Sequence, residues 1–494
     1  MSIAQHLPAL QVVIPLISAP IAVLIRHGGI AFAVVTAAAW TAFVTAILLW
    51  LQVGSAGDIS YHIGNWAPPW GIEYRVDALS AFVLVLVSGV ATVTLIYAWR
   101  SAAAEIPRDQ LYLFYALFSL CVSGLLGMTA TGDAFNLFVF MEIASLSSYV
   151  LIALGRDRRA LLAAYQYLIL GTIGATFYVI GVGLLYLVTG TLNIADIAAR
   201  LPQAQDARAV PAALAFITVG VSLKLALFPL HFWLPNAYAH APSAVTAFLA
   251  ATATKVSVYV LLRFYFGIFG VQLVTKSLPT PGILLALSIL AIVSASLVAL
   301  WQADLKRLFA YSSVAQIGYI TLGISFASQE GLTAAVVHLF NHGITKGALF
   351  LLVGGIALRA GSASLECARG LGRRMPLTSL GIVLAGLSLI GVPGTAGFIS
   401  KWYLVLAAIA AGQWWLAALV VATSLIAVAY VWRFVEAAYL SAPGERTPAA
   451  GEIPPAMLLP GWLLVGACLW FGLDTSYTVG GASRAAQLLL GGAP

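Results

Sequence analysis

Residues 221–235 read VSLKLALFPLHFWLP, and residues 391–401 read GVPGTAGFISK. Each stretch lies in a long apolar segment, contains a helix-breaking proline, and places a lysine (Lys224 or Lys401) beside the break. Proline removes a backbone donor and clashes with the preceding turn, so both helices are expected to kink or open. Irregular backbone at membrane depth needs cover from protein or water. These stretches therefore predict a helical membrane protein with an internal polar site; two ordinary proline kinks would leave the lysines unexplained.

The composition points to the same class. Of 494 residues, 62% are hydrophobic and 8% are charged, with a mean hydropathy of +0.99, whereas soluble proteins carry about 25% charged residues. Apolar runs of about 20 residues recur along the chain, and no alternating barrel pattern is present. We expect an all-α polytopic membrane protein with about 14 transmembrane helices, of which the seventh and twelfth are broken. The expected spans are 8–26, 30–53, 76–98, 110–129, 132–154, 160–189, 211–235, 242–267, 281–301, 307–326, 332–358, 377–409, 413–439 and 455–473.

The net charge of +7 indicates membrane topology and does not indicate nucleic-acid binding. With the N-terminus outside, the basic residues of the inner loops are Arg26, Arg100, Arg108, Arg156, Arg158, Arg159, Lys306, Arg307, Arg359, Arg369, Arg373, Arg374 and Arg446. Those of the outer loops are Arg75, Arg200, Arg208, Lys276 and Arg484. The positive-inside rule then predicts both termini on the outer face of a cell inner (plasma) membrane.

Several kinds of chemistry lack a sequence signature. Cys121, Cys367 and Cys468 form no C-x-x-C pair, so neither an iron–sulfur cluster nor a zinc site is expected. No phosphate-binding loop, dinucleotide fingerprint or hydrolase motif is present. We therefore expect no cofactor on this chain, and any redox centre would belong to another subunit.

Five ionisable residues lie near the middle of predicted spans: Glu142, Lys224, Lys255, Lys346 and Lys401. A charge at bilayer depth costs roughly 2.5–3.5 kcal/mol on insertion scales, and such residues usually mark an ion or proton path. The alternatives are a static ion pair or neutral acid at Glu142, and lysines that extend to the headgroups. Lys255 is expected in an unbroken span. Three charged residues near span ends are expected to be interfacial anchors: Arg263, Arg433 and Glu436.

Histidines extend this set. His338, His342 and Lys346 are spaced at i, i+4 and i+8, which places them on one helix face and suits a proton relay. A metal site or polar helix packing are the alternatives; no carboxylate or thiolate lies nearby in sequence to complete a metal shell. His231 and His240 flank the seventh-span break, where they either give water access from the inner face or cap helix ends.

Together these motifs resemble the proton-translocating antiporter-like family. The resemblance rests on Glu142, on Lys224 followed by the 229–235 run, on Ala-Pro-Ser at 241–243, and on the segments 304–313 and 391–401. The family includes membrane subunits of complex I, of energy-converting hydrogenases and of Mrp-type Na⁺/H⁺ antiporters. Residues 136–149 and 365–376 are most similar to the D-type subunits of the Mrp antiporters.

The resemblance implies two inverted five-helix repeats, spans 4–8 and 9–13. The regions are then an N-terminal three-helix region (1–109), the first repeat (110–267), the second repeat (281–440) and a C-terminal helix with a short tail (455–494). The short tail argues against the longer relatives.

The resemblance also implies a function. It pairs Glu142 with Lys224 and makes Lys401 the outlet of a horizontal polar axis. The expected function is proton translocation in a multisubunit Na⁺ or K⁺/proton antiporter, with other membrane subunits and the lipid bilayer as partners. The alternatives are a proton-pumping subunit of a complex I-like or hydrogenase-like enzyme, and a structural membrane scaffold.

Overall fold

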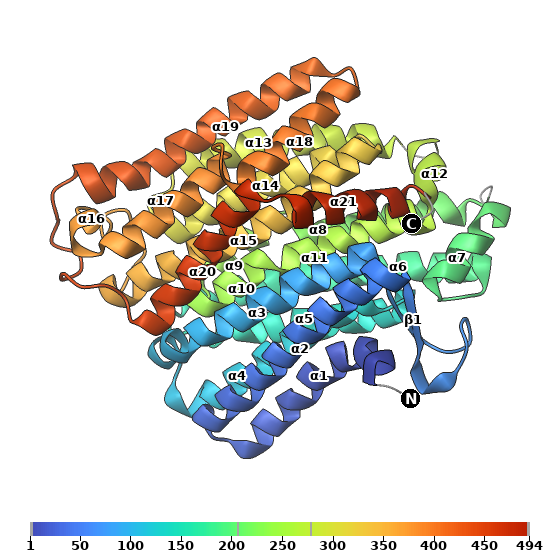
Figure 1. Ribbon diagram of the computed structural model, residues 1–494, viewed down its shortest axis with the longest axis horizontal. Coiled ribbons are helices and arrows are strands. Elements are labelled where there is room, and N and C mark those ends of the chain that lie inside the picture. The colour runs from blue at the N-terminus through green and yellow to red at the C-terminus, as the bar shows by residue number, and fades with distance from the viewer. Residues whose placement is uncertain (1–2, 205–206, 277–278, 492–494) are drawn as a thin grey trace.

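The computed structural model describes residues 3–204, 207–276 and 279–491. Residues 1 and 494, the outer limits of the predicted end regions, lie outside the described residues. Long helices run side by side in one bundle (Figure 1). Among the described residues, twelve helices are long and apolar enough to cross a membrane. The chain is a multi-pass, mostly helical membrane protein, as the sequence predicts.

The elements follow one another along the chain. The main helices are α1 (Leu7–Ile25), α2 (Gly28–Ala56), α3 (Ala78–Glu105), α4 (Leu111–Ala130), α5 (Ala134–Ala153), α6 (Arg159–Thr189), α7 (Ile194–Arg200), α8 (Ala209–Leu225), α9 (Trp233–His240), α10 (Ser243–Ala251), α11 (Ala253–Leu262), α12 (Gly270–Lys276), α13 (Thr280–Leu300), α14 (Leu305–Ser325), α15 (Gln329–Ala360), α16 (Leu371–Arg374), α17 (Pro376–Ile390), α18 (Ala396–Ala410), α19 (Trp414–Val435), α20 (Pro455–Leu473) and α21 (Ser476–Leu489). Two π-helical segments, Arg263–Ile268 and Glu436–Leu440, extend α11 and α19.

The helices that contain the proline stretches 221–235 and 391–401 are interrupted. The first is divided into α8 and α9, and the second into α17 and α18, with Gly391 at the end of α17 in a left-handed conformation (φ +92°). The expectation that Lys255 lies in an unbroken span is wrong. Its helix is interrupted at Thr252 (φ −125°, ψ −55°), between α10 and α11. Thr and Ala carry no breaker signal, so nothing in the local sequence indicates this interruption.

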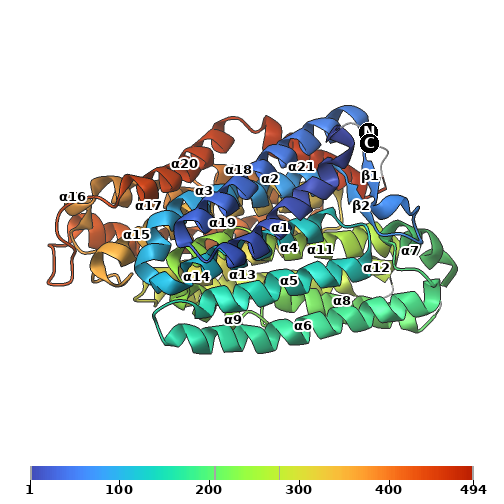
Figure 2. The same ribbon diagram turned by 90° about the horizontal axis from the view of Figure 1, so that it is seen from below.

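A small amount of strand structure departs from the all-α prediction. β1 (Ile59–His62) and β2 (Glu73–Val76) form an antiparallel hairpin between α2 and α3. The hairpin, α7, α12 and both ends of the described chain lie at the same end of the bundle, here called the terminal end (Figure 2). Helices that cross an even number of times bring the termini to one side.

Close helix contacts depend on small residues. α6 and α8 meet at Gly174 and Gly220, where a Cβ on Gly220 would lie 2.6 Å from the Gly174 carbonyl oxygen. Membrane helices approach closely through such residues because lipid supplies little hydrophobic drive between helices. The most enclosed helices are the broken pair α10–α11, together with α3 and α14. Polar side chains on these helices are consequently shielded from lipid.

Candidate functional site

Glu142 and Lys224 form an ion pair between α5 and α8. Lys224 Nζ lies 3.5 Å from Glu142 Oε1 and donates a hydrogen bond of 2.7 Å to Ser145 Oγ. The Lys224 side chain is 5% exposed, whereas that of Glu142 is 24% exposed. The pair therefore has one enclosed partner and one partner that opens toward the flank of the bundle.

Residues within the interruption between α8 and α9, just after Lys224, stabilise its conformation. Ala226 takes a left-handed conformation (φ 60°), which ends α8. The Trp233 indole N–H donates to the Leu223 carbonyl oxygen at 2.9 Å, which satisfies a backbone group near the helix end. The Trp233 ring also stacks on Tyr167, with centroids 3.8 Å apart. The opening in the seventh predicted span is thus a defined structure around Lys224.

Lys255 occupies the second break. Its Nζ donates to the Ala250 carbonyl oxygen at 2.5 Å and to Thr254 Oγ1 at 3.3 Å. Carbonyls at the end of a helix need partners from outside its own hydrogen-bond ladder, and the lysine is such a partner for Ala250, one residue before the end of α10. A cavity of about 20 Å³ is lined by Ser145 of α5, Lys224 of α8 and Ser257 of α11. That volume holds about one water molecule.

The predicted histidine ladder is formed on α15. The His338 and His342 rings stack with centroids 5.9 Å apart and an interplanar angle of 9°. His338 Nδ1 lies 2.7 Å from Ser400 Oγ, whereas neither ring nitrogen of His342 has a hydrogen-bond partner among the residues described. Buried polar groups of this kind are normally satisfied by water. His342 interacts electrostatically with both Lys255 and Lys346, so the ladder connects the two lysines.

Lys346 completes the ladder. Its Nζ donates to the Phe309 carbonyl oxygen at 2.8 Å and contacts Ser312 Oγ on α14. The lysine is fully buried. Within the described ranges, no three His, Cys, Asp or Glu side chains lie close enough to hold a metal ion. The contacts of the ladder are therefore with hydroxyls, carbonyls and other nitrogen bases.

Lys401 lies at the third break, where α17 gives way to α18. Its Nζ donates to the Ile390 carbonyl oxygen at 2.8 Å, to Leu389 at 3.3 Å and to Ser424 Oγ at 2.9 Å. The ammonium also lies over the Tyr319 ring, 4.8 Å from its centroid. Gly391 is required here, because a Cβ would lie 2.9 Å from Lys401 Cδ on a left-handed backbone. The lysine thus satisfies carbonyls at the end of a broken helix, as Lys255 does.

Three of these lysines share one unusual property. In the described part of the chain, Lys255, Lys346 and Lys401 have no carboxylate partner, and each donates to main-chain carbonyls and hydroxyls. A purely structural buried charge would normally be neutralised by an opposite charge. Of these four lysines, Lys224 alone has such a partner within the ranges that the structure covers.

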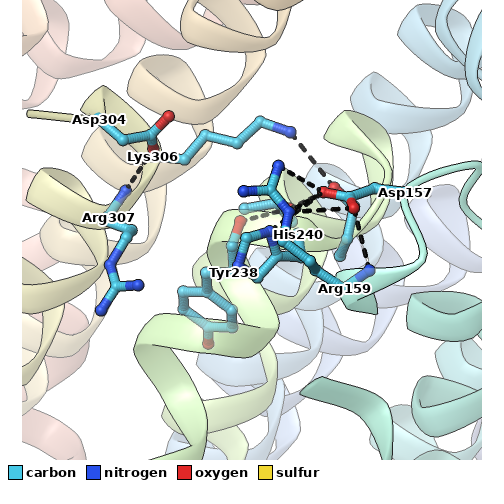
Figure 3. Close-up of polar contacts among 9 residues, drawn as sticks. Asp157, Arg159, Tyr238, His240, Asp304, Lys306 and Arg307 are labelled. Atoms are coloured by element: carbon cyan, nitrogen blue, oxygen red, sulfur yellow. Dashed lines mark hydrogen bonds and ion pairs between the residues drawn. The ribbon is translucent and has the colours of Figure 1, made fainter. Parts of the chain in front are cut away.

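A cavity of about 540 Å³ opens at the end of the bundle opposite the terminal end. We call it the vestibule. It is lined by the ends of α3, α9, α14 and α15 and by the loop before α6. Figure 3 shows Arg159 and His240 converging on Asp157, with Lys306 extending toward the same group. Lys306 Nζ donates to the Ala241 carbonyl oxygen at 3.2 Å.

Two charged groups of the vestibule have shifted proton affinities. Burial and the nearby Arg159 guanidinium lower the pKa of His240, although Asp157, 3.2 Å away, opposes this. Burial tends to raise the pKa of Asp157, but hydrogen bonds from Arg159 outweigh it and lower that pKa. Of the two histidines expected to give water access, His240 lines the vestibule. His231 is buried between Phe228 and Phe232 instead.

A family model described as NADH:quinone oxidoreductase/Mrp antiporter, TM matches residues 130–427. The chain belongs to this family. A relative from Desulforudis audaxviator, named as the N subunit of an NADH-quinone oxidoreductase, is 43% identical over 470 residues, covering 92% of this chain and 93% of the relative. The D-type Na(+)/H(+) antiporter subunit of Alkalihalophilus pseudofirmus is 31% identical, covering 78% and 76%. A chain in the Mrp complex of Dietzia sp. DQ12-45-1b superposes with a TM-score of 0.91 at 27% identity, covering 99% and 98%.

The segment that matches the antiporter family model contains every predicted relay residue, from Glu142 to Lys401. Two arginines that were expected to be interfacial anchors make tertiary contacts in the structure. Arg263 forms an ion pair with Asp77, and the two side chains are 13% and 3% exposed. Arg433 donates to the Gln302 carbonyl oxygen at 2.7 Å and also contacts that of Leu300, the last residue of α13. Proximity to a span end in sequence did not reveal these tertiary contacts.

Proposed function

We propose that this chain is the proton-translocating subunit of a multisubunit monovalent cation/proton antiporter, which exchanges Na⁺ or K⁺ for H⁺ together with partner subunits. One observation carries the proposal: buried titratable groups follow one another from the Glu142–Lys224 pair through Lys255 and the α15 ladder to Lys401. The similarity to a D-type antiporter subunit and to a chain of an Mrp complex supports it.

In this proposal the relay residues are Glu142, Lys224, Lys255, His338, His342, Lys346 and Lys401. Water in the small cavity beside Lys224 would connect the ion pair with α11. The stacked imidazoles would carry a proton between Lys255 and Lys346, since imidazole both accepts and donates one. Lys401 would exchange its proton with one bulk phase through the opened backbone at Gly391. The vestibule, through His240, would be the mouth on the inner face.

The finer architecture is also a proposal. Counting α8 with α9 and α17 with α18 as one broken span each adds two crossings to the twelve long apolar helices. Fourteen crossings suit the position of both termini at one end of the bundle. We infer that the terminal end is the outer face, that spans 4–8 and 9–13 form inverted repeats, and that the regions are 1–109, 110–267, 281–440 and 455–494.

The exposure of Glu142 points to a membrane partner. It shares one face of α5 with four exposed apolar residues at helical spacing, Phe135, Val139, Leu146 and Val150. A carboxylate that faced lipid tails at this depth would be costly, so another membrane subunit is expected to cover this face. Multisubunit membrane complexes are also the source of the superposable chains.

The second candidate is a proton-pumping membrane subunit of a redox complex, either complex I-like or hydrogenase-like. The 43% identity to a protein named as an NADH-quinone oxidoreductase subunit favours it. The proton path would be the same in both cases. Any redox centres would be carried by partner subunits, because this chain has no C-x-x-C pair and its three cysteines are buried and free.

Purification of the intact complex from its native membrane distinguishes these functions. The antiporter proposal expects co-purified membrane subunits without redox cofactors. In reconstituted vesicles, Na⁺ or K⁺ added across an imposed pH gradient should dissipate that gradient. Co-purified redox subunits, together with proton movement that requires an electron donor, would replace the antiporter proposal with the second candidate.

A further inference from the structure

A cavity of about 200 Å³ lies at the terminal end of the bundle. Its lining includes Asp58 beside the hairpin, Ile194 of α7, and both Tyr259 and Arg263. Tyr259 is one helical turn from Lys255 along α11, a rise of roughly 6 Å. A central residue of the proposed relay is therefore close to a hollow at the terminal end.

The Asp77–Arg263 ion pair lines this hollow, and along α11 Arg263 is one turn farther from Lys255 than Tyr259 is. Arg263 contacts Asp77 Oδ1, donates to Ser80 Oγ at 2.8 Å and donates to the Tyr259 hydroxyl at 3.0 Å. Tyr259 in turn donates to the Thr129 carbonyl oxygen at 2.8 Å, and the guanidinium lies 5.0 Å from the centre of its ring. The arginine is consequently held by α3 and by its own helix.

Three polar side chains follow one another along α11 and its π-helical extension. Lys255, Tyr259 and Arg263 are spaced at i, i+4 and i+8, so they occupy one face. Helical structure continues through Arg263 as a π-helical segment, a local widening that is frequent at functional sites. A proton moving between Lys255 and the terminal-end cavity along this face would meet the Tyr259 ring and then the guanidinium.

A guanidinium is suited to blocking protons. It does not deprotonate in proteins, so it cannot pass a proton onward as a lysine can. A fixed positive charge beside a narrow polar path excludes protons and cations electrostatically. A buried ion pair contributes little to stability, and apolar replacement of both partners is often neutral or stabilising. Stability alone therefore gives no strong reason for placing this pair here.

We propose that Arg263, held in position by Asp77, is an electrostatic barrier that prevents proton leakage between Lys255 and the terminal-end cavity. The barrier makes protons that reach Lys255 continue along the α15 ladder toward Lys401. This role rests on the proposed proton relay and adds to it an element whose function is to stop protons. The rival role is a structural staple between α3 and α11, and it predicts no change in proton conductance.

The test uses the intact complex in sealed liposomes with a trapped pH-sensitive dye and a valinomycin-imposed potential. The variant is Asp77→Asn combined with Arg263→Gln, which removes both charges and leaves none unpaired in the interior. The passive proton conductance should rise roughly tenfold: the Asp77 carboxylate offsets part of the guanidinium charge, and that factor corresponds to about 1.36 kcal/mol of remaining repulsion. Arg263→Lys keeps a positive charge at this position and should leak far less than the neutral pair.

The same cavity offers a matched control. Asp58 and Arg75 form an ion pair of 3.3 Å, with side chains 31% and 45% exposed, and both residues line the same cavity. Asp58→Asn with Arg75→Gln should leave the conductance at the wild-type value. Adding Lys255→Met to the neutral 77/263 pair should restore tight vesicles, because the leak would pass through Lys255.

Two results would overturn the barrier. One is wild-type conductance in the assembled neutral 77/263 pair, and the other is a leak that persists after Lys255→Met. The proposed function is judged separately, by coupled transport in the single Lys255→Met variant. Lost transport in that variant with no leak in the neutral pair would refute the barrier and leave the relay standing. Unchanged transport in Lys255→Met would instead refute Lys255 as a relay residue.

Discussion

Replacement of Glu142 by glutamine gives the most direct test of the relay. The substitution keeps the size of the side chain and its ability to form hydrogen bonds, but it removes the negative charge beside Lys224. At 3.5 Å, the attraction between the two charges is about 5 kcal/mol at an effective dielectric constant of about 20. Glu142 is 24% exposed, so contact with solvent or a partner reduces this to roughly 2–3 kcal/mol.

That interaction sets the expected loss of transport. Each 1.36 kcal/mol changes a rate about tenfold, so a relay that depends on the pair should slow by about 30- to 150-fold. The measurement is cation-dependent proton flux in vesicles that contain the assembled complex, with assembly checked on a native gel. Glu330→Gln is the control, because Glu330 is an exposed glutamate in the first turn of α15 and should not affect flux.

One outcome would contradict a role of the Glu142–Lys224 pair in transport. Near wild-type flux in a correctly assembled Glu142→Gln complex would mean that the ion pair only joins α5 to α8. The same outcome for Lys224→Met would favour the structural-scaffold alternative for the first half of the chain. Loss of assembly in Glu142→Gln would indicate that Glu142 helps α5 to bind the proposed partner subunit. Proton flux in the Lys224→Met complex would then decide whether the ion pair takes part in transport.

Three further predictions use the other sites. Lys255→Arg and Lys401→Arg should assemble and lose most transport, because guanidinium keeps its proton; Lys306→Arg should be tolerated, and normal flux in the first two would make them structural. In a cysteine-free background, an impermeant reagent added to intact cells should label Gln5→Cys but not Arg373→Cys, and the reverse pattern would invert the topology. Since the pKa of His240 is lowered in the folded state, the unfolded chain binds the proton first; thermal stability should therefore fall as pH drops below about 6.5, and less so in His240→Gln.

The features predicted correctly are those encoded locally. Span positions follow from runs of apolar residues, and the interruptions after Lys224 and before Lys401 follow from proline and glycine in those runs. The stacked His338 and His342 follow from a spacing of four on one helix. The interruption at Thr252 could not be predicted, because Ala-Thr-Ala-Thr is compatible with a continuous helix and tertiary packing decides its conformation.

The features that were missed depend on contacts between distant segments. Asp77 and Arg263 are 186 residues apart, and neither residue alone indicates the other. The vestibule likewise combines Asp157 with Lys306, which belong to different halves of the sequence. A search for acidic residues just before one span and basic residues at the end of another would have raised the Asp77–Arg263 pair as a candidate. It would have raised many incorrect pairs as well.

The contrast between Lys224 and the other relay lysines follows from what each one touches. A carboxylate carries a full negative charge and holds the ammonium proton of Lys224 firmly while both groups are ionised. A carbonyl carries only a dipole, so Ala250, Phe309 and Ile390 satisfy the hydrogen bonds of a lysine without neutralising its charge. The charges of Lys255, Lys346 and Lys401 therefore face only dipoles, whereas that of Lys224 faces an opposite charge. Broken helices supply the carbonyls of Ala250 and Ile390, which gives a physical reason for finding Lys255 and Lys401 beside a break.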